Sequence, residues 1–122
     1  MLVRYKKSCQ KIAMGLLSFM PQERNLKSLC QTITRYAEDP DWQLYLLKNE
    51  EDYIGLIGVE VADTYFTVHH ISVLPSFRGE GLGRKMIEKI QVLMQDREMR
   101  STKETEALLN HCLEKVQTKL IG

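Results

Sequence analysis

A chain of 122 residues with 43% hydrophobic and 27% charged residues has the composition of an ordinary soluble globular domain, which excludes a disordered or collagen-like chain. Its formal net charge of +1 excludes broad nucleic-acid binding, because domains that neutralise a phosphate backbone are clearly basic. We therefore expect one domain over residues 1–122, with no nucleic-acid partner.

The cysteines and the apolar run near the N-terminus bear on the compartment. Cys9, Cys30 and Cys112 are odd in number and widely spaced, which predicts neither a disulfide framework nor a metal site. We expect each to be a small buried hydrophobe in a reducing compartment. The apolar run over 12–20 is shorter than the roughly 18 residues of a membrane span, and no small-residue cleavage site follows it. These features predict a cytoplasmic protein without a membrane segment.

A short strand over 1–5 and two helices are predicted in the first third of the chain, because apolar residues recur there at helical spacing. The first helix covers 9–20 and ends at Pro21, and the second ends before Pro40. The residues expected on the buried face of the first helix are Ile12, Ala13, Leu16 and Leu17. Those expected on the second are Leu26, Leu29, Cys30, Ile33 and Ala37.

Three strands follow, where the period of the pattern changes from that of a helix to alternation. They are predicted over 42–48, 53–61 and 64–73. The connections between them are only a few residues long, which a parallel crossover would not allow. We therefore expect an antiparallel meander.

The last third of the chain predicts a helix, a short strand and a second helix. The first helix runs from 82 to about 95, the strand signal at 97–101 is weak, and the final helix covers 104–119. The apolar stripe of the final helix is expected to hold Ala107, Leu108, Cys112 and Val116. The predicted order of elements is β-α-α-β-β-β-α-β-α.

A glycine motif stands between the third of these strands and the helix that follows. It reads Arg78-Gly79-Glu80-Gly81-Leu82-Gly83-Arg84. Its alternate glycines remove Cβ atoms where a backbone would approach a ligand. The amides of 80–84 would lie at a helix N-terminus, where unpaired N–H groups favour a phosphate. The spacing excludes a dinucleotide fingerprint and a P-loop, and leaves a glycine-rich turn without a ligand as the alternative.

The residues before the glycines complete a second pattern. Ile71, Val73 and Pro75 form a strand ending of the type apolar-x-Val-x-Pro. Arg78, Gly81 and Gly83 form the sequence Arg/Gln-x-x-Gly-x-Gly/Ala. In both patterns and in their order, the chain resembles the Gcn5-related N-acetyltransferase (GNAT) family. Residues 1–7 and 14–21 further resemble small acetyltransferase-like proteins encoded in bacterial riboflavin operons.

The resemblance implies an α/β (α+β) fold in which helices flank a mixed, mainly antiparallel central sheet. Relatives usually continue after the last helix with two further strands. Here only ten residues follow Cys112, so we expect the usual C-terminal strand pair to be lacking. An unpaired strand edge invites pairing with another chain, so a homodimer is one expected assembly.

The resemblance also implies an acetyl-CoA-dependent N-acetyltransferase, linked to riboflavin metabolism, that acts on the amine of a small molecule. In the family, the strand over 71–73 pairs with pantetheine, a bulge frees a backbone amide (here that of Val73) for the oxyanion, and the glycine motif binds the pyrophosphate. The residues expected to bind acetyl-CoA are Ile71, Ser72, Val73, Arg78, Gly79, Glu80, Gly81, Leu82, Gly83 and Arg84. No metal is expected.

Acetyl transfer also needs a group that takes a proton from the amine. The candidates are His70, Glu60 and His69, and histidine has the pKa best suited to the task. Adjacent histidines on a regular strand point to opposite faces, so at most one should reach the cofactor cleft unless a bulge intervenes. Each of the three also fits a structural role.

The resemblance fails at one catalytic position. Family members often carry a tyrosine in the last helix that protonates the departing thiolate. The nearest residues here are Leu109, Asn110 and His111. The missing tyrosine favours an alternative reading, a non-catalytic acyl-CoA-binding or regulatory module of the same fold.

Overall fold

The computed structural model describes residues 1–23 and 25–111. The strands are β1 (Leu2–Arg4), β2 (Trp42–Asn49), β3 (Asp52–Val61), β4 (Tyr65–Val73) and β5 (Glu98–Ser101). The helices are α1 (Gln10–Leu17), α2 (Leu26–Glu38) and α3 (Leu82–Leu93), with single 3-10 turns at Lys7–Cys9 and Pro75–Phe77. A further helical segment begins at 106 and continues to the end of the described residues. The predicted order of elements is confirmed as far as residue 111.

One five-stranded sheet has the order β1-β2-β3-β4-β5, with neighbouring strands adjacent in the sequence. The pairs from β1 to β4 are antiparallel, whereas β5 runs parallel to β4. The mixed, mainly antiparallel sheet is therefore confirmed. A parallel pair needs a crossover connection, and α3 provides it, so β4, α3 and β5 form a βαβ unit. β5 is the last strand within the described part of the chain.

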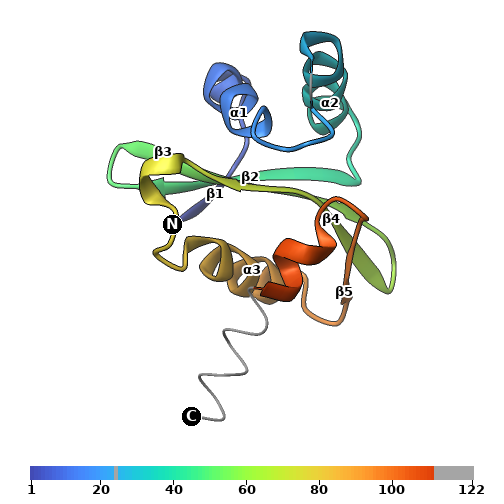
Figure 1. Ribbon diagram of the computed structural model, residues 1–122. Coiled ribbons are helices and arrows are strands. Elements are labelled where there is room, and N and C mark those ends of the chain that lie inside the picture. The colour runs from blue at the N-terminus through green and yellow to red at the C-terminus, as the bar shows by residue number, and fades with distance from the viewer. Residues whose placement is uncertain (24, 112–122) are drawn as a thin grey trace.

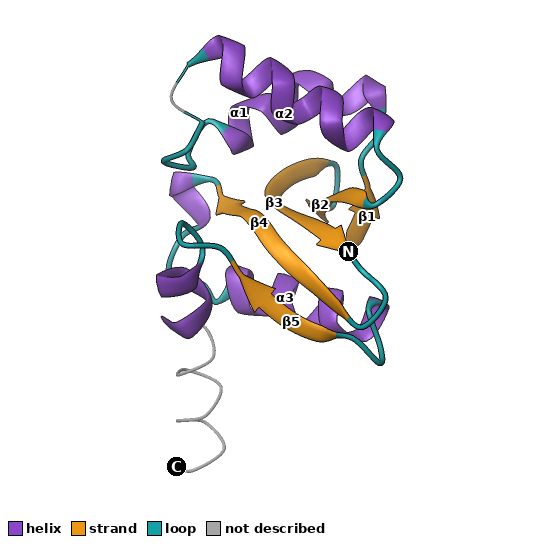
Figure 2. Ribbon diagram, turned by 90° about the vertical axis from the view of Figure 1, so that its right-hand side faces the viewer, coloured by secondary structure: helices purple, strands orange, loops and turns teal. Residues whose placement is uncertain are grey.

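Helices cover both faces of the sheet, which gives three layers. Figures 1 and 2 show α1 and α2 on one face, with α3 and the segment 106–111 on the other. The core on the α3 face consists of Leu47, Ile54, Ile57, Val59, Phe66, Val68, Ile71, Met86, Ile87, Ile90, Met94 and Leu109. The core on the α1 and α2 face consists of Cys9, Ala13, Leu16, Leu17, Ile33, Tyr36, Leu44, Leu46 and Leu56. Among the described residues, no helix has both the length and the apolarity that a membrane crossing requires.

The apolar face of α1 is narrower than predicted. Ala13, Leu16 and Leu17 are buried, but Ile12 is 44% exposed. The helix also ends at Leu17, before Pro21, because two tight backbone turns follow it. The core-facing surface of this short helix is therefore a single stripe.

The buried face of α2 was predicted in part: Ile33 is buried and Leu29 packs against the core, but three other predicted positions are exposed. Asn25 caps the helix by accepting a hydrogen bond from the backbone N–H of Ser28 at 2.8 Å. Ile33 and Tyr36 are the buried side chains of the helix, whereas Leu26, Cys30 and Ala37 are exposed. Burying the large ring of Tyr36 is more favourable than burying the small side chains of Cys30 and Ala37, and the Tyr36 hydroxyl hydrogen-bonds to His70 on β4. The prediction that every cysteine is buried is thus wrong for Cys30 and holds for Cys9, while Cys112 lies outside the described residues.

The final helical segment also turns a different side to the core. Leu109 is buried against α3 and the sheet, whereas Ala107 and Leu108 are exposed. Both exposed residues border a cleft, which explains why an apolar stripe is present without being buried. The predicted stripe positions Cys112 and Val116 lie outside the described residues.

A β-bulge at His69 changes the direction of side chains along β4. Gly58 of β3 pairs with His70 and the next residue, Val59, pairs with Val68, so His69 is an extra residue in β4. The bulge brings Val68 into the core on the α3 face and places both histidines on the α1 and α2 face. The two rings therefore share a face, which is the exception that a bulge allows. The resemblance implied a bulge at Val73, whereas the register irregularity lies four residues earlier, at His69.

Candidate functional site

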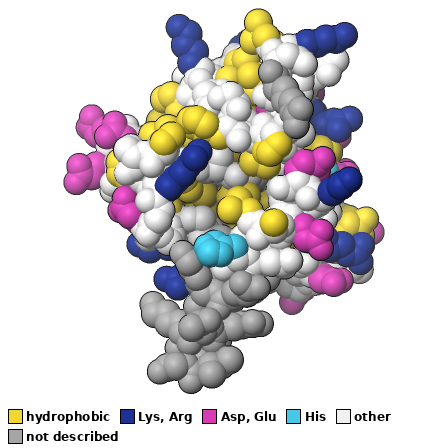
Figure 3. All heavy atoms as spheres, in the orientation of Figure 1, with side chains coloured by type: hydrophobic (Ala, Val, Ile, Leu, Met, Phe, Trp, Pro, Cys, Tyr) yellow, Lys and Arg dark blue, Asp and Glu magenta, His cyan; other side chains and the backbone are white. Residues whose placement is uncertain are grey.

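A cleft of about 680 Å³ opens where the C-terminal end of β4 meets the glycine motif. The segment after α1 forms one wall, the start of α3 forms a second, and residues 104–111 form the third. Figure 3 shows a hollow on this face with hydrophobic side chains in its floor and charged side chains around it. The predicted cofactor-binding residues that border the cleft are Ile71, Ser72, Val73, Arg78, Gly79, Gly81, Leu82, Gly83 and Arg84. Glu80 is exposed and does not border it.

Within residues 1–23 and 25–111, the edge of β4 that faces this cleft has no neighbouring strand over its last residues. β5 pairs with β4 over 65–68 alone. The carbonyl of His69 accepts from Gln22 Nε2 at 2.9 Å and that of Val73 accepts from Arg78 Nε at 3.0 Å, which shows that these residues point their backbone groups to this edge. Alternation along the regular part of the strand directs the backbone of Ile71 to the same edge. An extended ligand can therefore add to β4 as an extra strand.

The N-terminus of α3 is open to an anion. Gly79 has φ 86° and Gly81 has φ 77°, a left-handed conformation that favours glycine. Gly81 is the N-cap without a side-chain cap, and the first turn of the helix holds no acidic residue. The first hydrogen bond of the helix runs from Lys85 N to Gly81 O at 3.1 Å, which leaves the amides of 82–84 without an acceptor inside the helix. A Cβ built at Gly79 would meet no atom within 4 Å, so the space above the loop is free.

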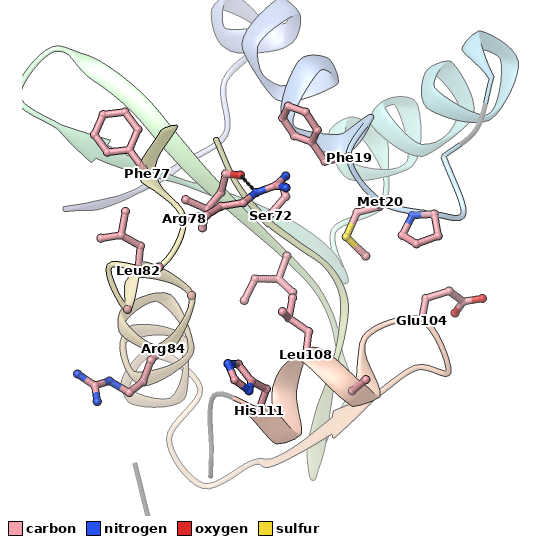
Figure 4. Close-up of a pocket in the computed structure, with 17 residues that line it drawn as sticks. Phe19, Met20, Ser72, Phe77, Arg78, Leu82, Arg84, Glu104, Leu108 and His111 are labelled. Atoms are coloured by element: carbon pink, nitrogen blue, oxygen red, sulfur yellow. Dashed lines mark hydrogen bonds between the residues drawn. The ribbon is translucent and has the colours of Figure 1, made fainter. Parts of the chain in front are cut away.

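Two arginines flank this N-terminus. Arg78 reaches across the cleft, where its guanidinium carbon lies 5.1 Å from the ring centre of Phe19 (Figure 4). Arg84 lies 3.7 Å from Glu88 through its Nε, which is buried and has no hydrogen-bond partner in the described residues. The uncapped helix and the two guanidinium groups together favour a ligand with negative charge.

A second depression of about 540 Å³ lies next to the cleft, bordered by α2, β2 and the bulge of β4. His69 borders it, with its Nε2 2.9 Å from Glu60 Oε1 and its ring stacked on Trp42 at 4.3 Å between centres. The guanidinium of Arg35 lies 4.6 Å from the ring centre of Trp42. The imidazole of His69 is therefore held by a carboxylate at one nitrogen and by an indole on its face.

His70 is only 4% exposed, and both of its ring nitrogens are engaged. Nδ1 lies 2.6 Å from the hydroxyl of Tyr36, and Nε2 lies 2.9 Å from Glu23 Oε1. The same carboxylate accepts hydrogen bonds from the hydroxyls of Ser28 and Thr32. These contacts tie α2, β4 and the segment before α2 into one buried polar network, in which each group is satisfied.

The directions of the pKa shifts of His70, Glu23 and Tyr36 indicate which of these groups carries a proton. Burial lowers the pKa of His70, although the neighbouring Glu23 acts in the opposite direction. Burial would raise the pKa of Glu23, but hydrogen bonds from Ser28, Thr32 and His70 outweigh it, so that pKa is lowered. Burial and nearby negative charge raise the pKa of Tyr36. His70 is therefore neutral, donates from Nε2 to an ionised Glu23, and accepts from the hydroxyl of Tyr36.

Acid should destabilise the fold through this network. The pKa values of His70 and Glu23 are depressed on folding, so each contributes stability that is complete above its unfolded value of 6.5 or 4.5 and is lost as pH falls through the folded value. We expect the urea midpoint to fall as pH decreases from about 6.5 to 4. The variant Glu23→Gln should show a lower midpoint at pH 7 and a weaker pH dependence. A midpoint that stays constant from pH 7 to 4 would contradict this assignment.

The sequence predictions thus divide between two neighbouring cavities. The predicted cofactor residues gather at the cleft, whereas the predicted proton acceptors His69 and His70 border the second depression, and Glu60 reaches it through its contact with His69. Sequence reasoning missed Glu23, a single acid in a loop, and Glu104, the residue that borders both cavities. Neither belongs to a motif that could have singled it out.

Residues 40–118 match the family profile described as "Acetyltransferase (GNAT) domain". The chain is 50% identical over 113 residues to a protein of Bacillus methanolicus named "Uncharacterized N-acetyltransferase in lysA 3′region", and the match covers 92% of this chain and 94% of that protein.

Two solved structures are similar in fold. The first is the aminoglycoside N-acetyltransferase AAC(6′)-Iy in complex with CoA, with a TM-score of 0.75 and 16% identity over 95% of this chain and 84% of that one. The second is a GNAT family acetyltransferase from Elizabethkingia anophelis with acetyl-CoA bound, with a TM-score of 0.59 and 18% identity over 75% of this chain and 55% of that one. At these identities the likeness shows a shared fold.

Proposed function

The chain belongs to the GNAT family of acetyltransferases, and on that premise we propose that it transfers the acetyl group of acetyl-CoA to the amine of a small molecule. One observation carries the proposal. In the part of the chain that the structure describes, an uncapped helix N-terminus with two glycines at positive φ and an unpaired strand edge border the same cleft. These are the two features that a molecule with a pyrophosphate and a chain of amides requires.

The chain's own backbone would hold acetyl-CoA. The amides of 80–84 would donate hydrogen bonds to the pyrophosphate, next to Arg84, whose buried Nε has no hydrogen-bond partner in the described chain. The backbone of Ile71 and Val73 would pair with the pantetheine amides along the open edge of β4. Arg78 would leave its hydrogen bond with the carbonyl of Val73 when pantetheine takes that acceptor.

The oxyanion that forms on the thioester carbonyl needs a fixed hydrogen-bond donor. The amide of Val73, predicted for this role, belongs to a residue whose backbone groups face the open edge. A preorganised backbone N–H in a partly enclosed cleft stabilises developing negative charge without rearrangement. We assign the donor to this edge of β4.

His69 is the better candidate for the base than His70. Both nitrogens of His70 are engaged by Tyr36 and Glu23, whereas His69 uses only Nε2, on Glu60, within the described residues. With Nε2–H donated to the carboxylate, Nδ1 of His69 is free to accept a proton. We assign the orientation of the imidazole to Glu60 and Trp42.

The transfer then balances as follows. The ammonium form of the acceptor loses one proton to His69, its nitrogen forms a bond to the acetyl carbon, and the carbon–sulfur bond breaks. The nitrogen loses a second proton to water as the amide forms, and the thiolate of CoA takes one proton on leaving, so one proton is released to the solvent overall. His111 borders the cleft and is the titratable side chain of the segment 106–111 best placed to supply that proton.

The riboflavin link is a narrower part of the proposal. It is supported by the resemblance of residues 1–7 and 14–21 to the RibT proteins of bacterial riboflavin operons. It would be supported further by turnover with an amine intermediate of flavin synthesis and by none with unrelated amines of similar size.

Release of free CoA thiol in the presence of acetyl-CoA and a panel of amines tests the activity. We expect His69→Ala to lower kcat by roughly 100- to 10,000-fold, because a general base contributes about that factor. Its affinity for acetyl-CoA should remain that of the unsubstituted protein, since His69 does not border the cleft. Glu60→Gln should cause a smaller loss of kcat.

Two results would count against this proposal. Binding of acetyl-CoA without thiol release for any amine would support the non-catalytic acyl-CoA-binding module instead. Full turnover by His69→Ala would remove His69 from the reaction.

A further inference from the structure

Glu104 lies between the cleft and the second depression. It borders both the cleft and the second depression, which no other residue of the described chain does. Figure 4 shows it at the edge of the cleft, with its carboxylate directed away from Leu108 and His111. A group bound to this carboxylate would lie in the second depression, next to the cleft where a thioester would end.

Of the carboxylates of Glu23, Glu60 and Glu104, that of Glu104 alone has no partner among the described residues. Glu23 is engaged by His70 and two hydroxyls, and Glu60 is engaged by His69. Glu104 forms no hydrogen bond or ion pair within residues 1–23 and 25–111, although its charge acts on His70. Among the described residues that line this depression, Glu23 and Glu104 are acids and Arg35 is the one Lys or Arg, while Glu60 contacts the lining residue His69. This balance favours a positively charged ligand.

A second, independent observation is an acceptor, unpaired in the described chain, on Gln22, a residue that lines the depression. Oε1 of Gln22 is buried and has no partner within the described residues, while Nε2 of the same side chain is held by the carbonyl of His69. An unsatisfied buried acceptor is costly, so a ligand hydroxyl or amine that reaches it would be favoured. Gln31 and Thr102 add further polar groups to the lining.

We infer that the second depression is the acceptor subsite, that Glu104 binds the ammonium group of the acceptor, and that the acceptor is a small cationic amine bearing hydroxyl groups. The volume of about 540 Å³ is that of a small-molecule site. Gln22 would accept a hydrogen bond from a hydroxyl, and His69, at the same depression, would take the proton of the amine. This inference rests on the proposed function for the transfer step, but binding of the amine does not depend on it.

The test compares Glu104→Gln with the matched control Glu106→Gln, an exposed acid two residues further on that borders neither cavity. The probes are three hydroxylated amines, ethanolamine, serinol and glucosamine, and one amine that is neutral at pH 7.5, aniline. We expect Glu104→Gln to raise KM for the hydroxylated amines roughly tenfold, with kcat and the affinity for acetyl-CoA little changed. Glu106→Gln and the KM for aniline should be unaffected.

Binding can be followed without turnover, because Trp42 is the single tryptophan of the chain and borders the same depression. Ethanolamine, serinol or glucosamine should change its fluorescence, with an affinity that weakens in Glu104→Gln and not in Glu106→Gln. If amines bind in this way but no thiol is released, the inference stands and the proposed function fails. If KM and the fluorescence titrations are the same in Glu104→Gln and the unsubstituted protein, the inference is wrong even where acetylation occurs.

Discussion

Gly81→Asp should weaken acetyl-CoA binding by roughly 100- to 1000-fold, whereas Gly81→Asn should stay within a few-fold of the unsubstituted protein. Gly81 is the N-cap of α3 at φ 77°, a conformation that asparagine and aspartate tolerate better than other side chains. The two variants therefore differ mainly in one negative charge at the proposed pyrophosphate site. Like charges about 4 Å apart at an effective dielectric constant of about 20 repel by about 4 kcal/mol, close to a thousandfold in affinity.

Titration calorimetry with acetyl-CoA measures the difference, and circular dichroism confirms that both variants fold. Aspartate is a good N-cap residue, so Gly81→Asp should lose binding without losing the helix. Raising the salt concentration should narrow the gap between the two variants, because screening weakens repulsion between exposed charges. Equal affinities for the aspartate and asparagine variants would show that the N-terminus of α3 does not hold the pyrophosphate.

Gly58→Ala should lower the free energy of unfolding by about 2–5 kcal/mol. A Cβ at Gly58 would collide with the hydroxyl and ring of Tyr36, which is buried and hydrogen-bonded to His70. The ring cannot move aside without leaving that nitrogen of His70 unpaired. The substitution therefore combines overpacking with the loss of a buried hydrogen bond.

Gly15→Ala is the matched control for this prediction. Gly15 lies within α1, and a Cβ there would meet no atom within 4 Å. The same change should raise the free energy of unfolding by about 0.5–1 kcal/mol, because alanine is the better helix former. Urea unfolding of both variants measures the pair, and an unchanged midpoint for Gly58→Ala would contradict the packing of Tyr36 against β3.

Much of the fold could be predicted because its patterns are local. Alternating residues place β2, β3 and β4, and short connections between them require antiparallel pairing. The end of α2 before Pro40 was predicted, whereas its N-cap Asn25 was not. The existence of β5 was predicted from a weak signal, and its parallel pairing with β4 depends on the crossover through α3, which alternation does not encode.

The sequence did not predict which face of α2 is buried or on which face of the sheet the two histidines lie, because a single tertiary contact or bulge decides each. The exposure of Cys30 and Ala37 follows from Tyr36, which turns the helix so that its hydroxyl meets His70. The two histidines share a face because His69 is an extra residue in β4, and a bulge leaves no mark in a run of strand-forming residues.

The site divides in the same way. The half proposed to bind acetyl-CoA contains a contiguous motif whose glycines and arginines lie within seven residues, and all residues of this motif except Glu80 border one cleft. The other half is assembled from α2, β2, β4 and the residue after β5 that borders both cavities, Glu104. No spacing in the sequence relates these parts, because the sheet brings them together.

The crystal structure of the protein soaked with acetyl-CoA tests the central claim most directly. We expect the pyrophosphate within hydrogen-bond distance of the amides of 80–84 and the pantetheine along Ile71 to Val73, with the acetyl group directed toward Glu104. A cofactor bound elsewhere, or a cleft that stays empty while the protein is saturated in solution, would contradict the account.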